Sequence, residues 1–264
     1  MPADPPTDLP DVAPSLLDIY LALSHIGPAT GALAPLAGEA PEETPRLHIA
    51  HTAAGEWRVF MRADLPAEVR ARLAALPPRI LFADASRVAD ALGERADLDE
   101  LNIWQGRTLL FPADLDAFVA QLAARDDLAR LAPDLVNAAN DADGWYGAPT
   151  PSRAHRRSAI APAHEAPPTR EVFPREQFAA LADGLVVATC QSARESALAA
   201  EAWVRTLPAA RGQGHATRVT ALWAFDALRR GKTPFYSHHR ANLASAGVAR
   251  ALQLIPFLED VGYL

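Results

Sequence analysis

Residues 204–219, VRTLPAARGQGHATRV, change character three times within a short segment. The segment begins as an expected strand, turns at Pro208, opens into the glycine-rich run of residues 211–214, and continues as an expected helix. A helix N-terminus presents backbone N–H groups that have no helical partner, together with a partial positive charge. Glycines in front of it let the backbone approach an anion closely. The segment therefore predicts a strand–loop–helix unit that could hold a phosphate.

Two common phosphate-binding motifs do not fit this loop. The dinucleotide fingerprint G-x-G-x-x-G fails because Thr217 stands where the third small residue is required. The P-loop fails at residues 231–233, GKT, because Asp226 occupies the position of its first glycine and because the segment ends a helix. A third pattern, Q/R-x-x-G-x-G/A, is satisfied by residues 211–216, RGQGHA. Of the three phosphate motifs, only this one fits.

The segments on either side of the loop are expected to form strands and helices. Strands are expected at residues 184–194, 197–208 and 233–239, and helices at residues 214–230 and 242–254. Gly231 suits the end of the first helix, because a left-handed glycine commonly follows a helix C-terminus. Asn242 is the expected N-cap of the second helix. The first helix is apolar over most of its circumference, which indicates that it is buried against a sheet.

The first part of the chain shows weaker signals. Helices are expected at residues 15–26, 66–76 and 85–92, two strands within residues 46–66 around a turn at Ala54-Gly55, and a strand at residues 106–112. Asp84 is the expected N-cap of the helix at residues 85–92. Residues 114–140 are expected to form one or two amphipathic helices. Residues 144–174 are proline-rich and contain a basic cluster at 153–157, so we expect a linker or a long loop there.

The order of motifs after residue 170 resembles the GNAT superfamily of N-acetyltransferases. The matching motifs are an SAR strand at 192–194, an EA-x-V-x-T strand at 201–206, the RG-x-G-x-A loop, a YS strand at 236–237 and an N-x-x-S-x-x-VA helix at 242–249. Each motif alone is weak, whereas the ordered set is specific. The resemblance implies the α+β GNAT fold, which is a mixed, mainly antiparallel central sheet flanked by helices. It divides the chain into a flexible tail (1–14), a smaller N-terminal α+β domain (15–112) and a GNAT domain (113–264).

This resemblance implies acetyl-CoA as co-substrate, held in a V-shaped opening between two neighbouring parallel strands. The strands concerned are the one that ends at Leu207 and the one at residues 233–239. The pantetheine arm would hydrogen-bond to the backbone of the first strand, and the loop N–H groups would hold the diphosphate. The residues expected to contact the coenzyme are Val204, Arg205, Thr206, Arg211, Gly212, Gln213, Gly214, His215, Ala216, Asn242 and Ser245. Alternatively, Arg211 is a solvated turn residue and Asn242 only a helix cap.

Acetyl transfer to an ammonium group requires a base, because the amine must be neutral when it attacks the thioester. Glu201 is our candidate, since it lies on the expected cofactor strand where several GNAT families keep a glutamate. Strand alternation places Glu201, Trp203 and Arg205 on one face. The structural alternative is therefore a salt bridge between Glu201 and Arg205 on an exposed sheet face.

The general acid is less clear, because Ala249 occupies the position where many GNAT members carry a tyrosine. Ser245, Tyr236 or water could protonate the departing thiolate. A thiolate with a pKa of about 8.5 also leaves readily, so that no acid is needed.

We therefore expect an acetyl-CoA-dependent N-acetyltransferase that acts on a small-molecule amine or a protein amino group. The alternatives are a non-catalytic acyl-CoA-binding or interaction protein with a degenerate GNAT fold, and an acyltransferase for longer acyl-CoA donors. A net charge of −7 gives no indication of nucleic acid or membrane as partner. The single cysteine, Cys190, fits a cytoplasmic protein. We expect a monomer or a homodimer. We expect no metal site, because the adjacent His238 and His239 would point to opposite faces of a strand.

Overall fold

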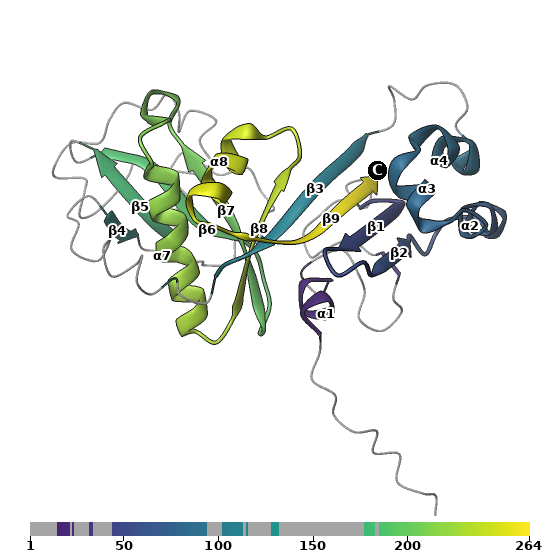
Figure 1. The fold of residues 1–264 in the computed structure, drawn as a ribbon, viewed down its shortest axis with the longest axis horizontal. Coiled ribbons are helices and arrows are strands. Elements are labelled where there is room, and N and C mark those ends of the chain that lie inside the picture. Colours follow the sequence, from purple (N-terminus) through teal and green to yellow (C-terminus); the bar gives the residue numbers. More distant parts are fainter. Residues whose placement is uncertain are drawn as a thin grey trace, which may run out of the picture.

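The computed structural model describes residues 15–21, 23, 32–33, 44–93, 102–112, 115, 128–131, 177–182 and 185–264 (Figure 1). Its strands are β1 (Leu47–Thr52), β2 (Trp57–Met61), β3 (Ile103–Leu110), β4 (Leu128–Leu131), β5 (Gln177–Ala182), β6 (Leu185–Glu195), β7 (Ala199–Thr206), β8 (Thr233–His239) and β9 (Ile255–Tyr263). Its helices are α1 (Leu16–Leu21), α2 (Ala67–Ala74), α3 (Pro78–Ala83), α4 (Ala85–Leu92), α7 (His215–Arg229) and α8 (Leu243–Ala251), with a short 3₁₀ helix, η3, at Pro208–Ala210.

The described strands form one nine-stranded sheet in the order β2-β1-β9-β3-β8-β7-β6-β5-β4. Neighbouring strands pair antiparallel, except that β7 and β8 run parallel. The predicted fold class is therefore confirmed as α+β with a mixed, mainly antiparallel sheet flanked by helices. The single parallel pair is the place where the sheet opens, as described below.

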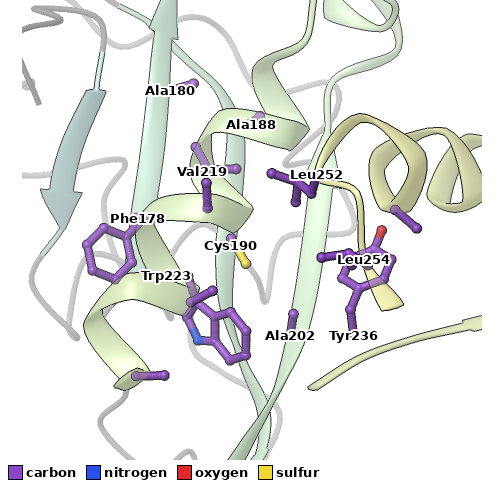
Figure 2. Packing of buried hydrophobic residues seen from close by; sticks show 14 of the residues in the cluster. Phe178, Ala180, Ala188, Cys190, Ala202, Val219, Trp223, Tyr236, Leu252 and Leu254 are labelled. Carbon is purple, nitrogen blue, oxygen red and sulfur yellow. The ribbon is translucent and has the colours of Figure 1, made fainter. Parts of the chain in front are cut away.

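Helix α7 covers one face of β5, β6 and β7 (Figure 1). Its apolar side chains join those of the strands in the largest buried cluster, of which Trp223, only 1% exposed, is a member (Figure 2). The Trp223 indole N–H donates to the hydroxyl of Ser192 on β6 over 3.1 Å, so its one polar group is satisfied. Cys190 is fully buried in the same cluster, and burial raises the pKa of its thiol. The rigid packing of α7 fixes the position of its N-terminus.

The opposite face of β7, β8 and β9 contacts helix α1. Leu17, Tyr20 and Leu21 of α1 share a buried cluster with Phe235 of β8 and Leu258 of β9. Phe235 and Tyr236 are consecutive strand residues, so they point to opposite faces, and Tyr236 belongs to the cluster around α7. Tyr20 and Phe235 meet edge to face with ring centroids 5.1 Å apart. The two faces of the central sheet are therefore covered by different helices.

Strand β9 joins the last residues of the chain to the first strands. It lies between β1 and β3, and its residues Val261 and Tyr263 pack with side chains of β1 and of helices α2–α4. The Tyr263 hydroxyl donates to the backbone oxygen of Leu81 in α3 over 2.9 Å. Strands from before and after residue 112 therefore belong to one sheet. The expected division into two domains at that residue stays a prediction.

Most of the expected elements are present. They include β1, β2, α2, α4, β3, β6, β7, α7, β8 and α8, at or within a few residues of the expected bounds. The caps are also confirmed: Asp84 accepts from the backbone N–H of Arg87 over 3.2 Å, and Asn242 from that of Ser245 over 3.0 Å. Gly231 adopts the expected left-handed conformation after α7, with φ of 74°.

The helical prediction for the segment that precedes the proline-rich stretch is wrong over part of its length. Residues Leu128–Leu131 lie within the segment expected to be helical, but they form β4, which pairs antiparallel with β5. Backbone pairing at this position outweighs the local helical pattern of the sequence. No local pattern in the sequence predicts β5, α3 or β9. The tail at 1–14 and the basic segment at 144–174 lie outside the described residues.

Candidate functional site

The parallel pairing between β7 and β8 ends soon after it begins. Its registered pairs are Ala199 with Thr233, Ala200 with Pro234, and Glu201 with Phe235. Beyond them β7 continues to Thr206 while paired with β6, and β8 continues to His239 while paired with β3. The inner edges of the two strands therefore part after Glu201, and the backbone of residues 204–206 has no registered strand partner on its β8 side among the described strands.

A cavity of about 510 Å³ lies at this opening. It is bounded by the end of β7, the loop before α7, the first turn of α7 and the first turns of α8. The expected coenzyme-contacting residues that line it are Val204, Arg205, Thr206, Arg211, Gly212, Gly214, His215, Ala216, Asn242 and Ser245. Gln213 is not among the lining residues, and its side-chain amide instead donates to the backbone oxygen of Ala209 over 3.4 Å.

The loop before α7 owes its path to two left-handed glycines. Gly212 has φ of 78° and Gly214, the N-cap of α7, has φ of 75°, a conformation that L side chains rarely adopt. Gly214 has no side chain, so the N-cap residue itself makes no side-chain hydrogen bond to the first turn of α7. Arg218, which was not among the expected site residues, stabilises this turn. Its guanidinium donates to the backbone oxygen of Gln213 over 3.2 Å and lies 2.7 Å from His215 Nδ1.

The groups around the cavity carry full or partial positive charges. Two helices, α7 and α8, begin at its wall, and each helix N-terminus carries a partial positive charge. Arg205 and Arg211 add full positive charges, and the described residues that line the cavity include no carboxylate. The Arg205 guanidinium also stacks on the Trp203 ring, 4.3 Å from its centroid. These features suit an anionic ligand, and a phosphate in particular.

The two candidate acids lie on the α8 side of the cavity. Ser245 lines the cavity itself, whereas Tyr236 is 1% exposed and lies in the buried cluster (Figure 2). Burial raises the pKa of Tyr236 to about 12, and the nearby Ser245 side chain acts against that rise. Tyr236 is therefore a protonated phenol at neutral pH. Ala249, the residue in place of the usual tyrosine, is buried and offers no hydroxyl.

Glu201 lies at the fork but not in the wall of the cavity. It is 4% exposed, and its Oε2 lies 3.1 Å from Nε of Arg194 on β6. The alternative of a Glu201–Arg205 salt bridge on an exposed face is therefore wrong, because Arg194 is the partner and Arg205 packs on Trp203. Ala200 and Ala202, its neighbours in the strand, belong to the cluster around α7, so Glu201 points to the α1 face.

A second buried carboxylate, Asp260 of β9, was not found by sequence reasoning. It is 5% exposed, and its pKa is raised to about 7, first by burial and then by the charge of Glu201, while Arg194 and a hydrogen bond from Trp104 act against that rise. No local motif marks Asp260, because only the insertion of β9 between β1 and β3 brings it to this face.

No family model matches the chain, and no curated protein matches it. Three solved structures that resemble it are described as GNAT proteins. A GCN5-related N-acetyltransferase-like protein from Streptococcus suis 89/1591 is 16% identical with a TM-score of 0.44, over 67% of this chain and 68% of the other. An acetyltransferase assigned to the GNAT family from Novosphingobium aromaticivorans DSM 12444 is 14% identical with a TM-score of 0.40, over 62% and 67%.

A tandem GNAT protein from the clavulanic acid biosynthesis pathway is 11% identical with a TM-score of 0.42, and it covers 92% of this chain and 93% of its own. Similarity at these levels assigns neither a family nor an activity. The chemistry of the cavity therefore has to carry the functional assignment. Within the described ranges, no helix is both long and apolar enough to cross a membrane, and no group of three or more His, Cys, Asp and Glu side chains is arranged to hold a metal ion.

Proposed function

We propose that this protein is an acetyl-CoA-dependent N-acetyltransferase of the GNAT type, with the coenzyme in the cavity between β7, α7 and α8. The observation that supports this most directly is the coincidence of three features at one place. They are the parting of β7 from β8 after Glu201, the start of α7 at a left-handed glycine N-cap behind a second left-handed glycine, and a lining whose described residues include arginines and no carboxylate. Coenzyme A has an extended amide-containing arm and a diphosphate, which match the first two features.

The arm would lie along the edge of β7 as an added strand, with its amides paired to the backbone of residues 204–206. The diphosphate would accept hydrogen bonds from the backbone N–H groups of residues 212–216, with Arg211 adding charge at the mouth of the cavity. In this orientation the thioester points toward the fork, where Glu201 and Phe235 form the last pair of the two strands.

The reaction is a direct attack in a ternary complex. An ammonium acceptor first loses a proton to Glu201, directly or through water, and its neutral nitrogen then attacks the thioester carbonyl carbon. A backbone N–H at the fork is suited to stabilise the developing oxyanion. The C–S bond breaks as the C–N bond is completed, and coenzyme A leaves as a thiolate that takes up a proton. Ser245, with Tyr236 behind it, is the candidate donor, because a buried phenol with a pKa of about 12 keeps its proton.

Donor binding is tested by thermal denaturation with increasing CoA. A ligand that binds only the folded state stabilises that state and therefore raises the melting temperature. At a ligand concentration of a hundred times Kd, the free energy of unfolding increases by about 2.7 kcal/mol. Arg211→Glu should reduce the shift, because it places a negative charge at the diphosphate. Arg250→Glu is the matched control, since Arg250 is exposed near the end of α8 and does not line the cavity. A melting temperature unmoved by saturating CoA contradicts the proposal.

Catalysis is tested separately by release of free thiol from acetyl-CoA in the presence of a panel of small amines and lysine peptides. Thiol release that depends on an amine supports transfer. A CoA-induced thermal shift without thiol release would instead support the non-catalytic acyl-CoA-binding alternative, for which the alanine at position 249 is the motivating feature. Faster release from succinyl-CoA or other longer donors would select a different acyltransferase.

A further inference from the structure

We propose that Arg218 is a positioning residue for the diphosphate site, because it fixes the loop of residues 211–214 in its anion-binding conformation before a ligand arrives. We call these four residues the phosphate loop. The identity of the anion as coenzyme A rests on the function proposed above, whereas the ordering of the loop is a property of the ligand-free chain. Arg218 is not among the residues that line the cavity, so it acts through the backbone of the loop.

The phosphate loop needs a restraint because glycines flank Gln213 on both sides. Gly212 and Gly214 are both left-handed, with φ of 78° and 75°. Glycine adopts positive and negative φ about equally well, and it loses more conformational freedom on folding than any other residue. The peptide between Gln213 and Gly214 therefore rotates with little steric hindrance. A rotated peptide would turn its oxygen toward a bound anion in place of its N–H group.

Arg218 holds this peptide from the beginning of α7. Its Nη1 donates to the backbone oxygen of Gln213 over 3.2 Å. The C=O and N–H groups of a trans peptide point in opposite directions, so the N–H of Gly214 is directed away from the guanidinium. Gly214 lines the cavity, whereas Gln213 and Arg218 do not. The carbonyl side of the peptide thus lies at Arg218 and its N–H side at the cavity.

A second contact fixes the guanidinium itself. Nη2 of Arg218 lies 2.7 Å from Nδ1 of His215, a residue that is 6% exposed. A guanidinium has only donors, so Nδ1 accepts this hydrogen bond and carries no proton. The ring proton is then on Nε2, which lies 3.3 Å from the side-chain oxygen of Gln213. The side-chain amide of Gln213 donates in turn to the backbone oxygen of Ala209 over 3.4 Å.

These contacts form one network in which each donor meets an acceptor. The network connects η3 to the beginning of α7 across the phosphate loop, and it holds Gln213 by both its backbone and its side chain. The guanidinium also lies directly against the loop, because a Cβ atom on Gly214 would be 3.4 Å from Arg218 Nη1. The affinity of a site falls in proportion to the fraction of molecules in the binding conformation. An ordered loop therefore raises the affinity for the anion.

The ordering is measured by ¹⁵N relaxation NMR of the backbone amides without any acyl-CoA. The Gly214 amide should be ordered in the wild type, with an order parameter near about 0.85. In Arg218→Met it should fall below about 0.6 or broaden by exchange, because methionine keeps a helix-forming side chain but has no donor. The matched control is Arg229→Met, which removes the same charge from an exposed position in the last turn of α7. That variant should leave Gly214 ordered.

The consequence for binding is measured by calorimetric titration with CoA. Arg218→Met should raise Kd about tenfold if only about a tenth of the molecules keep the binding conformation. Arg218→Lys should recover part of the affinity, because an ammonium donates to the Gln213 oxygen but lacks the two-pronged geometry that also reaches His215. Where thiol release occurs, the KM for acetyl-CoA should rise with Kd while kcat is retained, because the bound diphosphate orders the loop. A purely structural role would lower stability without this split.

An equally ordered Gly214 in the wild type and in Arg218→Met overturns the proposal. Should Arg218→Met not fold, the His215 ring of the wild type decides: its ¹⁵N shifts at neutral pH must show a proton on Nε2 and none on Nδ1, and a proton on Nδ1 contradicts the network. If CoA does not bind although the order of Gly214 depends on Arg218, the proposed function fails and the positioning role stands. If CoA binds the wild type and Arg218→Met equally tightly, the positioning role fails and the proposed function stands.

Discussion

Glu201 and Phe235 form the last registered pair between β7 and β8, and the sheet opens directly beyond them. Their side chains point to the same face, where Phe235 packs against α1 and Glu201 pairs with Arg194. The cavity lies further along β7, toward the N-termini of α7 and α8. The fork thus separates a positively charged cavity from a face that carries two buried carboxylates. A coenzyme and a cationic acceptor would reach the fork from these two differently charged sides.

Gly212→Ala should weaken coenzyme binding, and Gly231→Ala should not. Both glycines are left-handed, with φ of 78° and 74°, and neither has an atom within 4 Å of an added Cβ. Each substitution should therefore cost about 1 kcal/mol of stability from the same backbone strain. Only Gly212 lines the cavity, so only its variant should show a smaller CoA-induced thermal shift. Equal loss of the shift in both variants would contradict the assignment of the diphosphate to this loop.

Substitutions of Asn242 should separate its role as a helix cap from a role in ligand binding. Asn242→Ala removes the acceptor for the Ser245 N–H and should cost about 1 kcal/mol, measured by urea denaturation. Asn242→Asp keeps an acceptor and should retain most of that stability. Because a carboxylate in the cavity repels a phosphate, Asn242→Asp should nevertheless bind CoA less tightly. Full CoA binding by the aspartate variant would indicate that Asn242 is only a cap.

Gly106→Ala should destabilise the fold by about 1–3 kcal/mol, because the new methyl group has no room beside the Asp260 carboxylate and the Trp104 indole. The control is Gly247→Ala in α8, where nothing lies within 4 Å of an added Cβ. Alanine is a better helix former than glycine, so this variant should be neutral or more stable by up to about 1 kcal/mol. The two free energies of unfolding are compared by urea denaturation, and equal costs would contradict the close packing at Gly106.

The stability of the protein should depend on pH through Asp260. A carboxyl group whose pKa is about 7 when folded and about 4 when unfolded binds more protons in the folded state across that interval. The free energy of unfolding should therefore fall as pH rises from about 4 to 7, by up to about 1.4 kcal/mol per pH unit, and level off above. Asp260→Asn should remove this slope in urea denaturation. A slope of the opposite sign in the difference between the two proteins would contradict a raised pKa.

The sequence predicts the elements around the cavity better than it predicts the outer strands of the sheet. Glycine, proline and asparagine mark the bounds of β7, α7, β8 and α8, because their effect on the backbone is local. The strands β4 and β5 carry no such marks: FAALA in β5 has no alternation, and β4 lies within a helical pattern. Their structure comes from pairing with each other, which local sequence does not encode.

The environments of the two carboxylates illustrate the same limit. Glu201 is identifiable from its place in a motif, but its ion pair with Arg194 follows from the register shift in β6 between Ser192 and Arg194. Asp260 becomes part of the site only through distant contacts with β1, β3 and α1. Burial and charge at both residues are set by tertiary structure, and neither could be predicted from neighbouring sequence.

The central position of β9 dictates the order of assembly during synthesis. Residues 255–263 separate β1 from β3, so the ribosome must deliver them before the earlier strands can occupy their final neighbours. Strands made first must wait with open edges, which is a state prone to misassociation. Pairings between residues so far apart also close slowly. Completion of the sheet is therefore a late event, and the carboxylate pocket around Asp260 cannot exist before it.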